Sequence, residues 1–326
     1  MEEFRLIEFH HARDFGKKIN ATFEFIKQNF KPLAKSILLI AGPAVLIGSI
    51  LLGSFFSDLF SMFPKMGSGN AEALEFFKST SYWSQLGLMY LFLFLSYVVT
   101  LATINSYIQV YYKKKSNQIE VSEVWEGVRS LIWSYLGSLL MIIFCAALFM
   151  FVIVLVGIVL GKISTALLVI AMMAAGVGFI YLLVGIALVF FIQAHEGTGF
   201  FESAVRSLRL ISGKWWSTFG LSFILSMIGG VISYIFIIPY YIFIAVTAMH
   251  SVSGGGDVEM GSSLKTASYL FFTLYYMAQM LLQTLPQVGL VFQYFNLVEL
   301  KESKGLMGDI ENFGKPNDTD QRNETF

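Results

Sequence analysis

Six long stretches of this sequence contain no Asp, Glu, Lys, Arg or His, and they limit the chain to one class of fold. Each is long enough to cross the hydrocarbon core of a bilayer, which requires about 20 apolar residues. A water-soluble domain has too little core to bury six such segments. The stretches are Ser36–Ser57, Ser79–Tyr112, Ser130–Gly161, Ile163–Ala194, Trp215–Met249 and Thr266–Val298. They predict an all-α, polytopic membrane protein with six transmembrane helices.

The composition agrees with this class and excludes several kinds of partner. The chain is 56% hydrophobic and 13% charged, whereas soluble domains carry about 25% charged residues. Its formal net charge is zero, so the electrostatics give no support for a nucleic-acid partner. Cys145 is the only cysteine, which rules out a disulfide framework or a Cys-rich metal site within one chain. We therefore expect no cofactor and no metal site, and the lipid bilayer as the first partner.

Lys and Arg residues are distributed unevenly between the two sides of the six stretches. Of 22 such residues, 18 lie in the N-terminal arm, the second and fourth connections and the C-terminal segment, and 4 lie in the other three connections. Because short cytoplasmic segments are enriched in Lys and Arg, this bias predicts that both termini are cytoplasmic. The N-terminal arm is polar, so we expect the first apolar stretch to act as its own insertion signal.

A repeated pattern groups the six stretches into three pairs. Before each odd-numbered stretch, apolar residues recur at helical spacing with charged residues between them, as in an amphipathic helix that lies on a membrane surface. The apolar positions are Phe15, Ile19, Phe23, Ile26 and Phe30, with Lys17, Lys18, Glu24 and Lys27 between them; then Val121, Val124, Val128, Leu131 and Ile132; then Phe201, Val205, Leu208 and Ile211. The pattern predicts three repeats of an interfacial amphipathic helix plus a helical hairpin, roughly 13–112, 119–195 and 198–298. These form one membrane domain, 1–298, and a polar, mobile tail follows at 299–326.

Each even-numbered stretch ends with an apolar residue followed by a glutamine. These glutamines are Gln109, Gln193 and Gln293. One interpretation gathers the three amides around a common axis, where they bind a headgroup or a partner's backbone. The other makes them interfacial polar residues that hydrogen-bond to neighbouring helices, which is common in membrane bundles. The second interpretation is favoured.

The last stretch carries a second set of amides. Gln279, Gln283 and Gln287 step by four residues, so they share one face of a helix. Pro286 interrupts the same helix and frees backbone groups that neighbours must satisfy. Such a stripe either lines a substrate path, as broken helices do in transporters, or packs against the second and fourth stretches as a polar seam. The seam is favoured.

Basic and aromatic residues follow or flank the amphipathic segments, and we call them the collar. Aromatic rings and basic side chains of this kind favour the headgroup level of a membrane. The collar predicts a surface that binds an anionic lipid or another membrane protein. Its members are Arg129, Arg206, Arg209, Lys214, Trp215 and Trp216.

The apolar interior argues against enzymes and proton-coupled transporters. Ionisable groups inside a membrane are costly and usually functional, and the six stretches contain none. Proton-coupled transport and intramembrane hydrolysis usually need such groups. His195 and Glu196 form the one His–carboxylate neighbour pair beside a stretch. A solvated interfacial pair is favoured there over an acid–base site for a membrane-embedded lipid enzyme.

Two parts of the sequence resemble the membrane domain attached to some bacterial glycerophosphoryl diester phosphodiesterases, and related multi-span proteins of unknown function. The first part runs from Glu196–Gly197 through Glu202–Leu208 to Gly213–Gly220, and the second is Tyr294–Glu302. Asn296 stands where that family has an acidic residue. In the family, hydrolysis belongs to a separate barrel domain for which this chain has no room. The resemblance therefore implies an architecture and carries over no catalytic residue.

Together these observations predict a non-enzymatic protein of a bacterial inner membrane. The leading hypothesis is a scaffold or accessory subunit that works through the collar. The alternative is a carrier or flippase for a lipid-like or small amphipathic substrate, which would use the two sets of glutamines.

Overall fold

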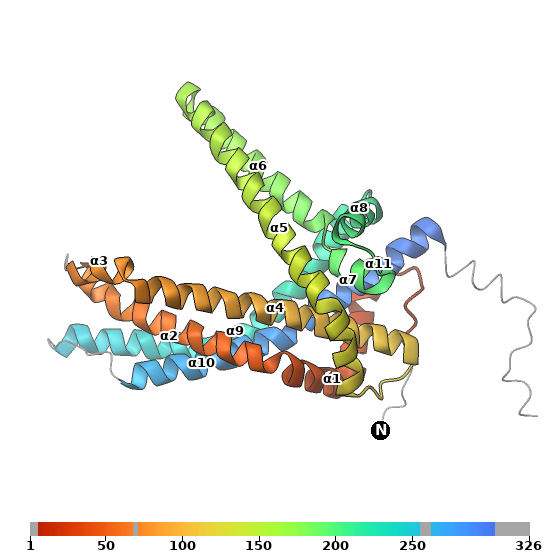
Figure 1. Ribbon diagram of the computed structural model, residues 1–326, viewed down its shortest axis with the longest axis horizontal. Coiled ribbons are helices and arrows are strands. Elements are labelled where there is room, and N and C mark those ends of the chain that lie inside the picture. The colour runs from red at the N-terminus through yellow and green to blue at the C-terminus, as the bar shows by residue number, and fades with distance from the viewer. Residues whose placement is uncertain (1–5, 68–70, 255–261, 304–326) are drawn as a thin grey trace, which may run out of the picture.

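The computed structural model describes residues 6–67, 71–254 and 262–303, and within these ranges all regular structure is helical (Figure 1). The helices are α1 (Phe15–Ile40), α2 (Gly42–Gly67), α3 (Ala71–Lys78), α4 (Thr80–Lys114), α5 (Val121–Ile163), α6 (Thr165–Gly185), α7 (Val189–Glu196), α8 (Phe200–Ile211), α9 (Trp215–Gly254), α10 (Ser262–Leu282) and α11 (Thr284–Glu302). α11 covers the start of the predicted tail, and the rest of that tail, 304–326, lies outside the described residues.

Five helical segments are long and apolar enough to cross a membrane. They are Gly42–Phe60, Thr80–Lys114, Val121–Ile163, Thr165–Glu196 and Trp215–Val246. The chain is thus an all-helical protein, in its described part, with the helices that a multi-pass membrane protein requires. These segments correspond to the first five of the six predicted spans, with shifted ends.

The sixth predicted span, Thr266–Val298, is divided between two helices. α10 ends at Leu282 and α11 begins at Thr284. Pro286 explains the interruption, because a proline has no N–H for the carbonyl of residue 282 and its ring crowds that carbonyl. The polar residues and the break keep this segment out of the set of long apolar helices.

The three predicted repeats differ at the junction between interfacial helix and span. Ala41 separates α1 from α2, and residues 212–214 separate α8 from α9, where Gly213 has a φ of 75° that favours glycine. In the second repeat the predicted interfacial segment is the first part of α5, which continues without a break to Ile163. No turn-forming residue interrupts α5 at that point, so a uniform threefold repeat is not observed.

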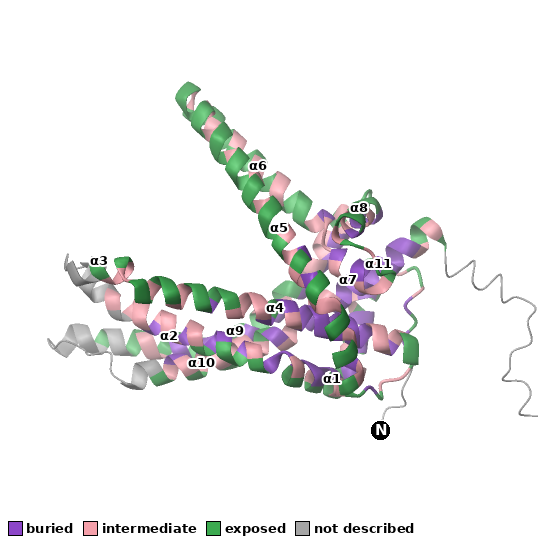
Figure 2. Ribbon diagram, viewed as in Figure 1, coloured by how far each residue is buried: buried purple, intermediate pink, exposed green. Residues whose placement is uncertain are grey.

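The helices form a bundle from which one hairpin diverges (Figure 1). α2 packs against α4 and α10, and α9 packs against α10 and α11. α5 and α6 pack against each other, and most of their outer side chains are exposed (Figure 2). α1, α7, α8 and α11 lie together at the opposite end of the bundle from α3, and we call this the α1 end.

The best-packed core lies at the α1 end, around α11. Every residue of α11 from Val288 to Val298 is buried. Phe25 of α1 and Tyr107 of α4 are fully buried beside it, and the Tyr107 hydroxyl donates a hydrogen bond to Asn29 Oδ1 at 3.0 Å. The α1 end therefore holds the most deeply buried core of the described structure, and the longer helices extend from it.

Gly53 allows α2 and α10 to approach closely, which generates a stability prediction. A Cβ atom at Gly53 would lie 3.1 Å from the carbonyl oxygen of Ser268 and from Tyr269 Cα. Gly53→Leu should force the helices apart and lower the free energy of unfolding by about 1–3 kcal/mol, the usual cost of overpacking. Thermal unfolding in detergent measures this loss. Gly87→Leu on α4 is the matched control, since nothing lies within 4 Å of its Cβ position. Equal unfolding temperatures for both variants would contradict the prediction.

Candidate functional site

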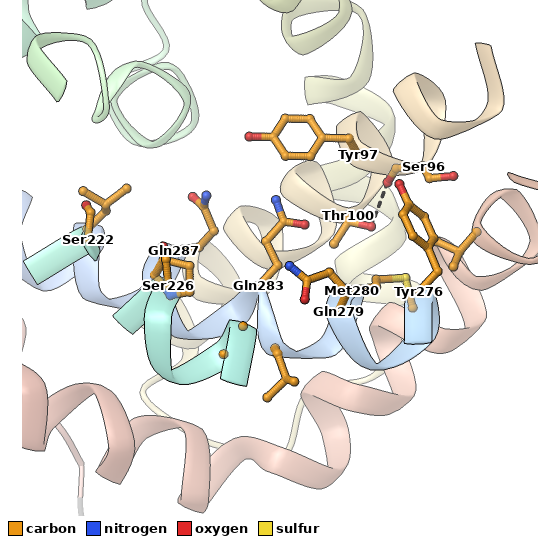
Figure 3. A pocket seen from close by; sticks show the side chains of 16 residues that line it. Ser96, Tyr97, Thr100, Ser222, Ser226, Tyr276, Gln279, Met280, Gln283 and Gln287 are labelled. Carbon is orange, nitrogen blue, oxygen red and sulfur yellow. Dashed lines mark hydrogen bonds between the residues drawn. The ribbon is translucent and has the colours of Figure 1, made fainter. Parts of the chain in front are cut away.

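A cavity of about 390 Å³ lies among α2, α4, α9, α10 and α11 (Figure 3). Its walls consist mainly of hydroxyl, amide, glycine and apolar residues. They are Val45, Ser96, Tyr97, Thr100, Ser222, Ser226, Gly229, Gly230, Tyr276, Gln279, Met280, Leu282, Gln283, Pro286, Gln287 and Leu290. None of these side chains carries a charge at neutral pH.

The glutamine stripe of the last predicted span borders this cavity. Gln279, Gln283 and Gln287 point toward the same space in Figure 3 and all three line it. Among the described residues, no side-chain hydrogen bond joins any of the three amides to another protein group. Gln279 is exposed, and Gln283 and Gln287 are half-buried. The stripe therefore lines an open space, from which water or a bound molecule can supply the hydrogen bonds of the amides.

The break between α10 and α11 positions the stripe. Gln283 N donates to Gln279 O at 2.9 Å, and Gln287 N donates to Gln283 O at a longer 3.4 Å. Gly229 of α9 lies opposite the break, where an added Cβ would be 3.4 Å from Leu282 O. Pro286 leaves this carbonyl without its helical donor, and the glycine lets α9 pass close to it. At the break, α9 thus presents a glycine and no bulky side chain to the cavity wall.

Hydroxyl groups from α4 and α9 face the glutamines across the cavity. Tyr97 and Thr100 come from α4, and Ser222 and Ser226 come from α9. The Ser222 hydroxyl oxygen is buried and has no hydrogen-bond partner. Tyr97 and Ser226 are exposed, so the cavity opens at the surface of the bundle. Amides and hydroxyls can donate and accept hydrogen bonds, and this set suits a neutral or zwitterionic polar group.

A buried lysine, Lys18, lies beside the start of α9. The sequence did not single it out as a site residue. Lys18 was placed between the apolar positions of the first amphipathic segment, but only 2% of its surface is exposed. Its ammonium donates to Gln293 Oε1 at 2.6 Å and to Ser217 Oγ at 3.0 Å. Gln293 Nε2 in turn donates to Thr218 Oγ1 at 2.9 Å. Within the described chain no carboxylate pairs with Lys18.

The lysine cluster and the cavity share a polar stripe on α9. Thr218, Ser222 and Ser226 step by four residues and therefore lie on one face of that helix. The first belongs to the lysine cluster, and the other two line the cavity. The site thus extends from neutral amides within the bundle to a cation at the α1 end.

The environment of Lys18 disfavours its charge. Burial lowers the pKa of Lys18 to about 8, the nearby Lys214 also lowers it, and Asp14 opposes the shift. The orientation of α1 causes this burial. The buried face of α1 is Lys18, Ala21, Thr22, Phe25, Asn29, Leu33, Ser36 and Ile37. Phe15, Phe23 and Phe30, which marked the predicted apolar face, are exposed.

The three glutamines that end the even-numbered stretches contact separate neighbours. The Gln109 Oε1 atom lies 3.2 Å from His195 Nδ1, and Gln193 and Ser138 exchange hydrogen bonds at 2.8 and 3.1 Å. Gln293 belongs to the lysine cluster. Each of these three amides thus hydrogen-bonds to a residue of another helix, and among the described residues the three do not bond to one another.

The collar divides between internal contacts and exposed groups. Arg206 forms ion pairs with Glu196, at 3.1 Å, and with Glu302, which fixes α8 to α7 and α11. The hydroxyl of Tyr294 donates to the same Glu196 at 2.6 Å. The Glu196 carboxylate is therefore bound by both Arg206 and Tyr294. This arrangement does not favour an acid–base pair with His195.

The remaining collar residues are arranged as follows. Trp215 stacks on Tyr181 and donates from its ring nitrogen to the Tyr181 carbonyl at 3.1 Å. Trp216 is 77% exposed. The Arg129 guanidinium lies 5.1 Å from the Trp125 ring centre. The carbonyl of Arg209 accepts a hydrogen bond from Lys301 at 2.7 Å, and Lys214 is exposed. Only part of the collar is thus free to contact lipid or a partner.

Comparison of the chain with protein-family models, curated proteins and solved structures finds no match. The resemblance to the phosphodiesterase membrane domain stays a prediction, and the site is interpreted from its own geometry.

The buried ammonium predicts a pH-dependent stability. Between the folded pKa of Lys18, about 8, and the usual value of 10.5, the unfolded chain binds more protons than the folded one. The free energy of unfolding therefore rises with pH across that window, and this gain is absent below it. Unfolding temperatures from about pH 7 to about pH 10 should rise in the wild type relative to Lys18→Met. Lys17→Met, at the exposed neighbouring position, should keep the wild-type trend. A trend equally lost in both variants would contradict this assignment.

The unpaired amides predict a hydrated cavity, which cysteine labelling can detect. Cys145 is the only cysteine, so Cys145→Ser gives a clean background. On that background Gln283→Cys should react in liposomes with a charged, membrane-impermeant thiol reagent. Leu274→Cys, on α10 and outside the cavity lining, should react far more slowly. Equally slow labelling at both positions would show that the cavity is dry.

Proposed function

We propose that this protein is a carrier or flippase that binds an amphipathic, lipid-like molecule in the cavity between α4, α9 and α10. The glutamine stripe carries the proposal, because three amides that have no side-chain partner among the described residues line one space in a bundle of apolar helices. A polar substrate headgroup would supply the hydrogen bonds that these amides lack. The three glutamines lie along α10, the break and the start of α11, and all of them line this one cavity.

The proposed topology makes α10 and α11 the sixth crossing of a bacterial inner membrane, with both termini cytoplasmic. The excess of Lys and Arg residues in the N-terminal arm and even-numbered connections supports this orientation. The elements that adjoin those connections gather at the α1 end (Figure 1). A helix broken within the membrane is tolerated where it lines a cavity, and the cavity at the α10–α11 break meets that condition.

The lining chemistry indicates the class of substrate. The cavity walls offer amide and hydroxyl groups but no ionised side chain, so they match a neutral or zwitterionic headgroup better than a strongly anionic one. Exposed Tyr97 and Ser226 mark openings toward the surrounding lipid, through which acyl chains could remain in the bilayer. The substrate class that fits is a phospholipid or another amphipathic molecule with a neutral or zwitterionic polar headgroup.

A scaffold or accessory role is the second candidate. Its support is the exposed aromatic and apolar surface of α8 and the start of α9, including Phe201 and the 77% exposed Trp216. Arg206 serves internal ion pairs, so this role would rest on Arg129, Arg209, Lys214 and Trp216. Such a function leaves the unpaired glutamines without an explanation, and the carrier proposal accounts for them.

A lipid-movement assay tests the proposal. Purified protein in liposomes should accelerate transbilayer movement of a fluorescent, zwitterionic phospholipid relative to protein-free liposomes. The combined Gln279→Leu, Gln283→Leu and Gln287→Leu variant should be slower by about 100-fold, since three lost hydrogen bonds of about 1 kcal/mol each raise the barrier by about 3 kcal/mol and 1.4 kcal/mol is a factor of ten. Leu274→Ala, outside the cavity lining, should move lipid like the wild type. A wild type that moves no lipid, or a triple variant that matches it, would contradict the proposal and favour the scaffold role.

A further inference from the structure

A second pocket, separate from the cavity, lies between α1 and the connection from α4 to α5. Its volume is about 750 Å³. Residues from both elements line it: Lys27, Gln28, Phe30, Lys31, Pro32, Lys114, Asn117, Gln118, Ile119 and Glu120. None of these positions belongs to the collar or to the glutamine sets.

The lining of this pocket is basic. Three lysines, Lys27 and Lys31 of α1 and Lys114 at the end of α4, border it together with one carboxylate, that of Glu120. At neutral pH the lining therefore has a formal charge of +2. Lys27 and Lys31 are one helical turn apart, so their ammonium groups lie on the same side of α1.

The carboxylates near the pocket neutralise it only in part. Glu123 pairs with Lys114 at 2.9 Å. Glu120 caps the start of α5, and its carboxylate accepts a hydrogen bond from Ser122 at 3.3 Å. Lys31 forms no ion pair within the described residues. Among the described residues, Lys31 therefore keeps a positive charge that no carboxylate pairs with.

An apolar surface adjoins the basic one. Phe30 lines the pocket and is 57% exposed. Leu38 and Leu39 are further exposed apolar residues toward the end of α1. α1 thus carries lysines and large apolar side chains side by side, as helices do that lie at the boundary between headgroups and acyl chains.

We propose that this pocket binds the phosphate of an anionic glycerophospholipid, with the lysines on the phosphate and Phe30 against the acyl chains. Lysine is a common phosphate ligand that acts as a point charge. The amides of Gln28, Asn117 and Gln118 supply further donors at the rim. A free phosphate ester would satisfy the lysines but not the exposed phenylalanine, which favours the lipid. A lipid held here would tie α1 to the α4–α5 connection, independently of any transport through the cavity.

Lipid binding to matched variants tests this site. Full-length protein in a neutral detergent should bind phosphatidylglycerol, as counted by native mass spectrometry. The pair Lys27→Gln and Lys31→Gln should weaken binding by about 25-fold, taking about fivefold for each lysine near a membrane surface. The control pair Lys35→Gln and Lys113→Gln removes the same charge, one lysine from α1 and one from α4, without touching the pocket lining, and should change binding less than about twofold. Lys114 is left in place because its loss would also unpair Glu123.

A charge change in the opposite direction and a soluble competitor complete the test. Glu120→Gln removes the carboxylate from the lining and should tighten phosphatidylglycerol binding, an effect that general destabilisation would not produce. Soluble glycerol phosphate should fail to displace the lipid, and phosphatidylcholine should bind weakly. Equal losses in the pocket and control pairs would overturn the proposal. Displacement by glycerol phosphate would also overturn it, since the pocket would then take a soluble phosphate ester.

Discussion

The bilayer core offers no hydrogen bonds, and the structure of this protein follows from that constraint. Polar groups at membrane depth must find partners within the protein or draw water or a ligand toward them. Most of them do find partners: Gln193 bonds to Ser138, Asn29 to Tyr107, and Gln293 to Lys18 and Thr218. The stripe at Gln279, Gln283 and Gln287 differs from these groups, because no hydrogen bond joins its amides to another described side chain and all three line one cavity.

The same constraint explains the orientation of α1. In a soluble protein the apolar face of an amphipathic helix turns inward, because water surrounds the other face. At a membrane surface the apolar face turns toward lipid, and the mixed face packs against protein. α1 behaves in the second way: Phe23 and Phe30 are exposed, while Lys18, Thr22 and Asn29 are buried. The lysine cluster and the basic pocket both depend on this orientation, since they use adjoining sides of α1.

Parts of the fold and site could be predicted from particular residues, and parts could not. The spacing of Gln279, Gln283 and Gln287 placed them on one face, and Pro286 indicated the break that separates α10 from α11. Spacing could not decide whether that face meets another helix or a cavity, since this depends on Gly229 and the hydroxyls of α9. The unbroken α5 was likewise missed, because an amphipathic segment and a span can join into one helix when no residue interrupts them.

The sequence by itself determined that the chain is helical and membrane-embedded, since six charge-free stretches admit no other solution for their backbone groups. It also determined that any polar chemistry within those stretches uses groups such as amides and hydroxyls, because the stretches contain no Asp, Glu, Lys, Arg or His. Only the tertiary structure decided which of these residues hydrogen-bond to neighbouring helices and which face a cavity where a ligand could bind. That choice depends on the distances between helices far apart in the chain. Local periodicity reports which face a residue occupies, but it does not report what lies opposite.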